Sequence, residues 1–524
     1  MLTCKSKIFG LSLAALTAAG ALPALAETVN LRLGEDPGTL YNIQTVLGTA
    51  NSIINGYILE RLVYFDASGT PQPWLAESWT VSDDQTEITF KLRDGITFTD
   101  GTPFNAAAVA AQFNAVLDPA NASPQLALHG PLQSVTADDD LTVTFKYGAP
   151  FASAFSALAG YAGGINSPTA VEKAGDDYGR HPVGTGPYML DSWIPGTSVT
   201  LVRNPDYHEP PFRDDVENQG TPYADKFVLT VISEDGVTQA ALETGELTAS
   251  ILPADAIPLF DGNPDFKTVM DKTSGNLMFL EFNQLKAPFD NPEFRRAIGY
   301  AIDRDSALAA SYAGYGSPAY SPLSAAIPGY DPKVAEDLGT PYDPAKATEI
   351  LKGLGWTDSN GNGTLDKDGQ EAEWTIKSYA GFSTVDRTLQ VIQANLADIG
   401  IAVDLETADW GAFYPSLLED GWDMDLMRWT DSDPDILNQL FLGDGHRDHL
   451  KPNPQIDEIL TRCSQTMEPE ARMSCVSDAQ RAMLEDMTIV PILTNWNIYA
   501  TQANVTGYHF DALGYILPQD IKTD

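Results

Sequence analysis

The sequence has few cysteines and few basic residues, and it lacks the short motifs of common hydrolases and metalloenzymes. Only 3 of its 524 residues are Cys, and 31 Lys and Arg are set against 72 Asp and Glu, a formal net charge of −41. Such a surface repels nucleic acid and anionic lipid. There is no His-Glu-x-x-His, Cys-x-x-Cys or Gly-x-Ser-x-Gly, which argues against a dedicated zinc site and an α/β-hydrolase nucleophile. We therefore expect no nucleic-acid partner and no cofactor.

Long apolar runs are also scarce, and the one at the start of the chain predicts a signal peptide. Two Lys residues precede an Ala- and Leu-rich run over 8–22, and Ala24-Leu25-Ala26 forms a small-x-small cleavage site. We predict that residues 1–26 are removed, with cleavage before Glu27, and that the mature protein lies in the periplasm. A membrane anchor is the alternative, which the shortness of the run disfavours. No later run is long enough to span a membrane, so we expect no membrane insertion.

What remains is a long chain with alternating strand and helix patterns. The predicted mature chain is too long for one hydrophobic core, which favours two or three lobes. Ile88, Phe90 and Leu92 alternate with polar residues, the period of a strand with one buried face. Apolar residues over 389–399 recur at helical spacing, and the alternating residues 401–405 follow after a Gly. Helix followed by strand predicts an α/β fold.

Three sequence segments in fixed order identify a family resemblance. Residues 57–109 contain Gly-x-x-x-Pro-x-Leu-Ala-x-x-Trp, then Phe-x-Leu-Arg-Asp-Gly, then Phe-x-Asp-Gly-x-Pro-Phe-x-Ala. Residues 182–188 read Pro-Val-Gly-Thr-Gly-Pro-Tyr, and residues 283–303 read NQLKAPFDNPEFRRAIGYAID. In this order the three segments resemble the extracytoplasmic solute-binding proteins of peptide- and nickel-type ABC importers, family 5.

The resemblance implies a two-lobed α/β periplasmic-binding-protein fold with an extra inserted domain and hinge closure around a ligand. The implied parts are lobe I over 27–59, 184–279 and 491–524, an inserted domain over 60–183, and lobe II over 280–490. It also implies a monomer that delivers its ligand to an inner-membrane ABC permease and the associated ATPase. The protein is then expected to be a carrier and not an enzyme.

A short peptide is the ligand that the resemblance favours. An oligosaccharide, an opine-like conjugate or a nickel chelate is the alternative within the same import role. A secreted acidic hydrolase, such as a glycosidase that uses two carboxylates, is the alternative of another class. It would explain export and acidity, but not the three ordered segments.

The segment 427–435, Met-Arg-Trp-Thr-Asp-Ser-Asp-Pro-Asp, holds the main candidate binding residues. It follows a predicted buried strand, and ligands of open α/β lobes lie beyond the carboxyl ends of strands. In peptide-binding relatives a Trp at this place is followed by an Asp that pairs with the ligand's α-ammonium. Trp429 matches that Trp, Arg428 adjoins it, and either Asp431 or Asp433 faces the ligand. The alternative is an Asp-Pro turn that caps a helix.

Other candidate ligand contacts are fewer and weaker. Tyr379 follows a predicted strand at 374–378, and Tyr41 and Asn42 belong to the opening loop. Ordinary packing is the alternative for each of the three.

Cys463 and Cys475 are the two cysteines of the predicted mature chain. They lie on neighbouring predicted helices, 454–467 and 469–486, in an oxidising compartment. Relatives in the family often have a disulfide in this region. We expect a disulfide that closes the helical hairpin, with two buried thiols as the alternative.

One loop resembles the first half of a calcium site. Asp358, Asn360 and Asn362 stand at positions 1, 3 and 5 of a calcium loop, a Gly stands at position 6, and Asp366 follows. Position 12 is Gly369 where a bidentate Glu is needed. We expect a turn-rich surface loop without metal, and a bound calcium ion is the alternative.

Overall fold

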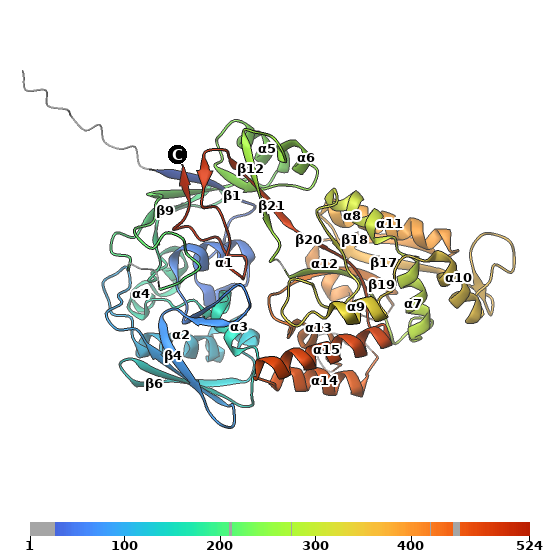
Figure 1. Ribbon diagram of the computed structural model, residues 1–524, viewed down its shortest axis with the longest axis horizontal. Coiled ribbons are helices and arrows are strands. Elements are labelled where there is room, and N and C mark those ends of the chain that lie inside the picture. The colour runs from blue at the N-terminus through green and yellow to red at the C-terminus, as the bar shows by residue number, and fades with distance from the viewer. Residues whose placement is uncertain (1–26, 209–211, 274, 420, 444–450, 524) are drawn as a thin grey trace, which may run out of the picture.

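The computed structural model has two lobes side by side (Figure 1). It describes residues 27–208, 212–273, 275–419, 421–443 and 451–523. The predicted signal peptide, 1–26, lies outside the described residues. Among the helices that are described, none combines the length and the apolar character needed to cross a membrane.

The first lobe is built on a seven-stranded mixed sheet drawn from three separate stretches of the chain. Its strands, in spatial order, are β12 (Phe266–Asp271), β21 (Asn497–Gln502), β11 (Ala249–Ile251), β1 (Thr28–Leu33), β10 (Lys226–Val231), β9 (Ser198–Arg203) and β8 (Tyr188–Ile194). Its main helical segments are α1 (Gly48–Ile53), η2 (Ile54–Ile58), α5 (Asp235–Glu243) and α6 (Ile257–Phe260). The strand nearest the N-terminus, β1, runs parallel to β10 in the centre of the sheet. The C-terminal strand β21 lies between β11 and β12, so the chain returns to the first lobe at its end.

Residues between β1 and β8 form a separate four-stranded antiparallel sheet with its own core. Its strands are β4 (Ala76–Val81), β5 (Glu87–Leu92), β7 (Thr142–Tyr147) and β6 (Leu132–Asp139), accompanied by the hairpin β2 (Val63–Phe65) and β3 (Pro71–Pro73). Its helices are α2 (Ala106–Leu117), α3 (Ala154–Ala159) and α4 (Pro168–Ala174). We call this part the inserted domain.

The second lobe holds a six-stranded sheet and most of the long helices. The strands, in spatial order, are β14 (Gly316–Pro318), β20 (Val490–Asn495), β13 (Asn276–Phe282), β19 (Met424–Thr430), β17 (Glu373–Tyr379) and β18 (Ala402–Ala408). The helices are α7 (Pro292–Ala301), α8 (Arg304–Tyr312), α9 (Pro332–Leu338), α10 (Pro344–Gly353), α11 (Ser383–Asp398), α12 (Trp410–Ser416), α13 (Ile436–Phe441), α14 (Pro454–Gln465) and α15 (Pro469–Asp486). Together they enclose one large hydrophobic core.

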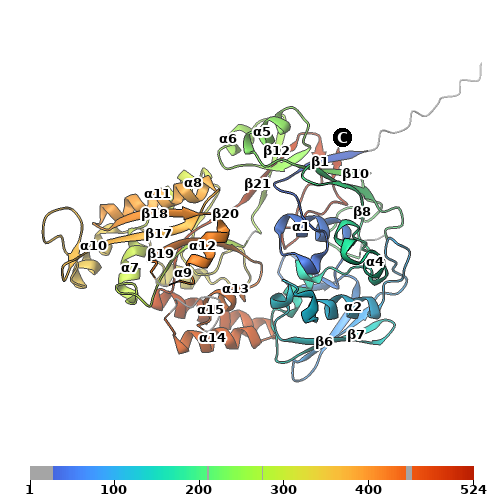
Figure 2. The ribbon, with the colours of Figure 1, turned by 180° about the vertical axis from the view of Figure 1, so that it is seen from behind.

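The chain crosses between the lobes at positions a few residues away from the predicted limits. We expected limits at 279/280 and 490/491. All seven residues of β13 are buried in the second sheet, and β20 pairs with β13 there. The crossings therefore lie between β12 and β13 and at Trp496, between β20 and β21, which Figure 2 shows from behind. The limits that the resemblance implies thus fall inside β13 and directly after the first residue of β20.

Local patterns predicted the elements themselves well. Ile88, Phe90 and Leu92 are buried on one face of β5. The side chain of Asn291 accepts a hydrogen bond from the N–H of Glu293 at the start of α7, where Pro292 occupies the first turn. These predictions are confirmed.

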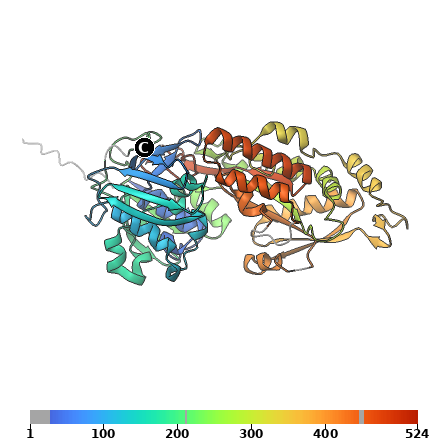
Figure 3. The same ribbon diagram turned by 90° about the horizontal axis from the view of Figure 1, so that it is seen from below.

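The helix pair α14–α15 reaches from the second lobe to the inserted domain (Figures 1 and 3). The N–H of Ala152 donates to the carbonyl of Ser464 over 2.8 Å, and Met467 packs against the core of the inserted domain. The lobes therefore contact each other away from the crossing strands as well as through them.

Candidate ligand-binding cavity

A cavity of about 610 Å³ lies between the lobes, a volume within the usual range for small-ligand sites. The inserted domain, the β12–β13 crossing, the second lobe and the C-terminal segment all contribute to its wall. Polar and aromatic residues on the wall include Ser153, Ser156, Tyr161, Asp271, Thr273, Asp431, Asp433, Asp435, Asn438, Asn497, Tyr499 and Tyr515. The cavity lies beyond the carboxyl end of β19, as expected for an α/β lobe.

Asp433 is buried and bound by residues from both lobes. Arg472 of α15 donates to both of its oxygens, over 2.6 and 3.1 Å. Ser153 of the inserted domain donates to it over 3.0 Å, and Ser156 donates to the other oxygen. Burial acts to raise the pKa of Asp433, but the charge and hydrogen bonds of Arg472 outweigh burial and hold that pKa below its ordinary value. Asp433 is thus an ionised carboxylate whose charge is already balanced within the protein.

The pKa values of Asp431 and Asp435, in contrast, are raised. Oδ1 of Asp431 accepts from the N–H groups of Ser432 and Asp433, over 2.7 and 2.9 Å. Burial, together with the charge of Asp433, raises the pKa of Asp431 to about 6 and that of Asp435 to about 7. Both carboxyl groups would be ionised more readily if a cation entered the cavity.

Apart from Asp271, the remaining wall is apolar or neutral. Leu128, Phe151 and Leu513 supply apolar surface, and Tyr161 and Tyr515 supply aromatic rings. Among the described residues that line this cavity, none is Lys, Arg or His. The wall can therefore offer carboxylates and apolar surface to a ligand, but no cationic side chain.

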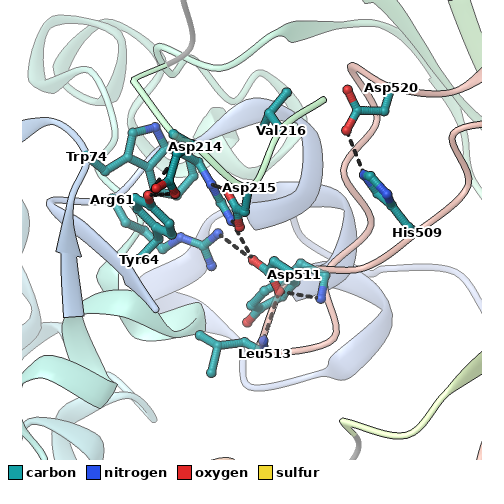
Figure 4. A network of polar contacts seen from close by, with 12 residues as sticks. Arg61, Tyr64, Trp74, Asp214, Asp215, Val216, His509, Asp511, Leu513 and Asp520 are labelled. Atoms are coloured by element: carbon teal, nitrogen blue, oxygen red, sulfur yellow. Dashed lines mark hydrogen bonds and ion pairs between the residues drawn. The ribbon is translucent and has the colours of Figure 1, made fainter. Parts of the chain in front are cut away.

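The C-terminal part of the wall is held in place by a buried polar network (Figure 4). Oδ1 of Asp511 accepts from the N–H groups of Leu513 and Tyr515, over 3.0 and 2.9 Å, which fixes the turn that carries both wall residues. Its other oxygen accepts from Arg213 over 3.3 Å, and Arg61 lies 3.9 Å away. The guanidinium of Arg61 lies 4.7 Å from the centre of the Tyr515 ring. The two arginines thus support the wall from behind.

Three other predicted binding residues lie near the end of β19, but not on the wall of this cavity. Trp429 is partly exposed, and its ring lies 6.4 Å from that of Trp410. Tyr379 is buried, with its ring 5.7 Å from Trp410. Arg428 donates to the hydroxyl of Tyr312 over 3.3 Å. The structure thus gathers Trp429 and Tyr379 around Trp410, a half-exposed ring that sequence reasoning did not select.

Tyr41 and Asn42 lie in the first lobe and are buried against the inserted domain. The amide of Asn42 donates to the carbonyl of Gly164 over 2.8 Å and accepts from Asn166 over 2.6 Å. The ring of Tyr41 lies edge-on to that of Tyr178, at 4.7 Å. Neither lines the cavity described above, and their contacts are those of the packing alternative.

The loop at 358–366 uses its side chains to bind its own backbone. Asp358 accepts from the N–H groups of Gly361, Asn362 and Gly363, and Asp366 accepts from Ser359. Asn360 donates to Glu371 on the neighbouring strand. Within the described ranges, no group of three or more His, Cys, Asp or Glu is arranged to hold a metal ion. These contacts are those of a turn-rich surface loop.

Cys463 of α14 and Cys475 of α15 are joined by a disulfide. Both are buried, and the bond ties together the two helices that reach the inserted domain.

Sequence reasoning missed the residues that close the cavity from other parts of the chain. Tyr161 comes from the inserted domain and Tyr515 from the C-terminal segment. Arg472 lies in a predicted helix, and nothing in the surrounding sequence marks it as part of a site. Asp435 had a signal, since it follows Asp431 and Asp433 at the same spacing, but it was not selected.

Comparison with known proteins gives consistent results. A family model described as "Bacterial extracellular solute-binding proteins, family 5 Middle" matches residues 70–448. The glutathione-binding protein GsiB of Escherichia coli strain K12 is 32% identical over 451 residues, which cover 83% of this chain and 82% of GsiB. Among solved structures, NikA from Brucella suis in complex with Fe(III)-EDTA matches with a TM-score of 0.84 at 22% identity, over 95% of this chain and all of that one. The oligopeptide-binding protein AppA from Bacillus subtilis, in complex with a nonapeptide, matches with a TM-score of 0.75 at 22% identity, over 95% of this chain and 99% of AppA.

Proposed function

The chain belongs to family 5 of the bacterial extracellular solute-binding proteins, and on that basis we propose that it binds a short peptide in the cavity between its lobes. The peptide would be delivered to an ABC permease in the inner membrane and to its ATPase. The named relatives are solute-binding proteins, so a hydrolase is not favoured. Cleavage before Glu27 would release the protein into the periplasm.

One observation carries the peptide proposal: the cavity is walled by both lobes and contains the carboxylate of the half-buried Asp431, which has no basic residue on the described wall to neutralise it. A peptide supplies an α-ammonium group for that carboxylate, as in relatives that pair an Asp with it. The apolar and aromatic wall can receive peptide side chains. Closure of the lobes around the peptide would then bury the pair and favour the closed arrangement.

The alternatives within the family agree less well with the wall. Glutathione, which gives one relative its name, carries two carboxylates and a single ammonium group. Fe(III)-EDTA, which is bound by another relative, is an anion. Bringing either next to buried aspartates would place like charges together, at a cost of several kcal/mol in such a cavity.

A thermal-shift screen with di- to pentapeptides tests the proposal. We expect several peptides to raise the melting temperature, and we expect N-acetylated forms of the same peptides to lose the effect. Asp431→Asn should weaken the response, whereas Glu406→Gln, which makes the same charge change at an exposed position on β18, should not. Trp429→Ala should also reduce the response, because it removes the aromatic ring on β19 that lies two residues before Asp431. A broad library that gave no shift would show that peptides are the wrong ligand class.

A further inference from the structure

Asp435 is a second carboxylate of the cavity wall, and one of its oxygens is buried without a hydrogen-bond partner among the described residues. It is only 8% exposed, and its Oδ1 has no hydrogen-bond partner in the described part of the chain. Oδ1 of Asn438, three residues further along, is also buried without a hydrogen-bond partner in that part, and Asn438 also lines the cavity. Two unfilled oxygen acceptors in one wall are a ready-made site for a group that donates several hydrogen bonds.

The acidity of the chain as a whole does not account for this arrangement. An acid-rich protein carries carboxylates on every surface, where water stabilises their charge. A buried carboxylate is different, because its ionised form is strongly disfavoured unless an opposite charge compensates. Burial has already raised the pKa of Asp435, and the charge of Asp433 adds to that effect.

The protein supplies only part of the compensating charge: Arg472 acts to lower the pKa of Asp435, but burial and the charge of Asp433 outweigh it. The charged and titratable groups around Asp431 and Asp435 are Asp433 and Arg472 in the second lobe and Tyr161 in the inserted domain. Arg472 donates to both oxygens of Asp433 and does not line this cavity, although it lines a small adjoining cavity together with Asp435 and Asn438. Tyr161 is neutral at physiological pH, since burial raises its pKa to about 12.

We infer that the solute carries two positive charges, and that Asp435 with Asn438 binds a cationic group beyond the ammonium group that we assign to Asp431. The inference rests on the proposed function and narrows it to short peptides with Lys or Arg at or next to the amino terminus. A primary ammonium or a guanidinium can donate to the carboxylate and to the amide oxygen at once. Asp435 is then a specificity-determining residue, and the cavity rejects anionic solutes.

Calorimetric titration with three tripeptides that differ only in the first residue, which is cationic, neutral or anionic, tests this. We expect Lys-Ala-Ala to bind about tenfold or more tightly than Ala-Ala-Ala, and Glu-Ala-Ala to bind more weakly than both. Asp435→Asn should abolish the preference for Lys-Ala-Ala while leaving the affinity for Ala-Ala-Ala within about threefold. Glu406→Gln serves as the matched control, and it should keep the full preference because it changes net charge outside the cavity.

The outcomes separate this inference from the peptide proposal. If Lys-Ala-Ala and Ala-Ala-Ala bind equally, the peptide proposal stands and the inference is wrong. The inference is also wrong if Asp435→Asn weakens all three peptides by the same factor, since that result indicates a structural role. If no peptide binds, 1,4-diaminobutane replaces the peptides as a probe. Binding of this diamine that Asp435→Asn removes supports two cationic subsites without a peptide ligand, and no binding overturns both.

Discussion

Three aspartates at alternate positions have different chemical states because their neighbours differ. Asp433 is bound by Arg472 and is an ionised structural group. Asp431 and Asp435 lie in the same segment, Asp435 buried and Asp431 half-buried, and no arginine in the described part of the chain donates a hydrogen bond to either; loss of solvent contact raises the pKa of each. The sequence presented Asp431 and Asp433 as equal candidates for the ligand. The contacts favour Asp431, because a carboxylate that already binds a guanidinium gains little from a second cation.

At the residue scale, Asp425 gives the clearest pH prediction. It is fully buried on β19, opposite Glu281 of β13 and beside Lys377 of β17, and burial raises its pKa to about 8. A carboxyl group with a raised pKa in the folded state binds a proton that the unfolded chain releases. Its contribution to stability is therefore fully present below about pH 4 and is lost as pH rises to about 8. The expected slope is roughly 1.4 kcal/mol of unfolding free energy per pH unit in that window.

Asp425→Asn should remove that slope. We expect the melting temperature of the wild type to fall more steeply than that of the variant between pH 5 and pH 8, whatever the offset between them at pH 5. Asp404→Asn, at an exposed position on β18, is the control and should keep the wild-type slope. Parallel melting curves for wild type and Asp425→Asn across this range would contradict the raised pKa.

At the scale of elements, the sequence predicted the helices and strands that local periodicity determines. It missed the arrangement that strand pairing determines. The strand β5 and the helix α7 follow directly from residue spacing and capping. The placement of β13 in the second sheet does not, because a strand with all seven residues buried has no exposed face to reveal its neighbours. The cavity wall has the same limitation, since Tyr161 and Tyr515 come together only through the return of the chain to the first lobe.

The helix pair α14–α15 should depend on its disulfide for stability. Cys463 and Cys475 are 12 residues apart in sequence. A disulfide that closes a loop of about this length restricts the unfolded chain and raises the free energy of unfolding by roughly 3 kcal/mol. The Cys463→Ala, Cys475→Ala double variant should therefore melt several degrees below the wild type, measured by scanning calorimetry on the chain from Glu27. A thiol titration of the unreduced, denatured wild type should find no free thiol. Two titratable thiols, or equal melting temperatures, would count against the bond.

At the scale of the whole molecule, contacts between the lobes lie on two sides of the fold. On one side the guanidinium of Arg387 in α11 contacts the carboxylate of Asp255 in the first lobe through two bonds of 2.5 Å. The hydroxyl of Tyr315 donates to Asp261 over 2.7 Å in the same region. The first pair is largely exposed, and such pairs contribute at most about 1 kcal/mol. The buried contacts of Asp433 with the inserted domain are the stronger candidate for holding the lobes together.

Those contacts predict a variant that changes closure without changing cavity charge. Asp433 and Arg472 belong to the same lobe, so their ion pair survives opening, whereas Ser153 and Ser156 leave with the inserted domain. The Ser153→Ala, Ser156→Ala double variant should therefore lose hydrogen bonds to a charged group only in the closed arrangement. Apparent solute affinity should fall by about tenfold, because it scales with the closed fraction. Small-angle scattering of the ligand-free variant should give a larger radius of gyration than the wild type, and saturating solute should remove the difference. Ser192→Ala, at an exposed position on β8, is the matched control. Unchanged affinity and radius in the double variant would mean that the lobes are held by the crossing strands alone.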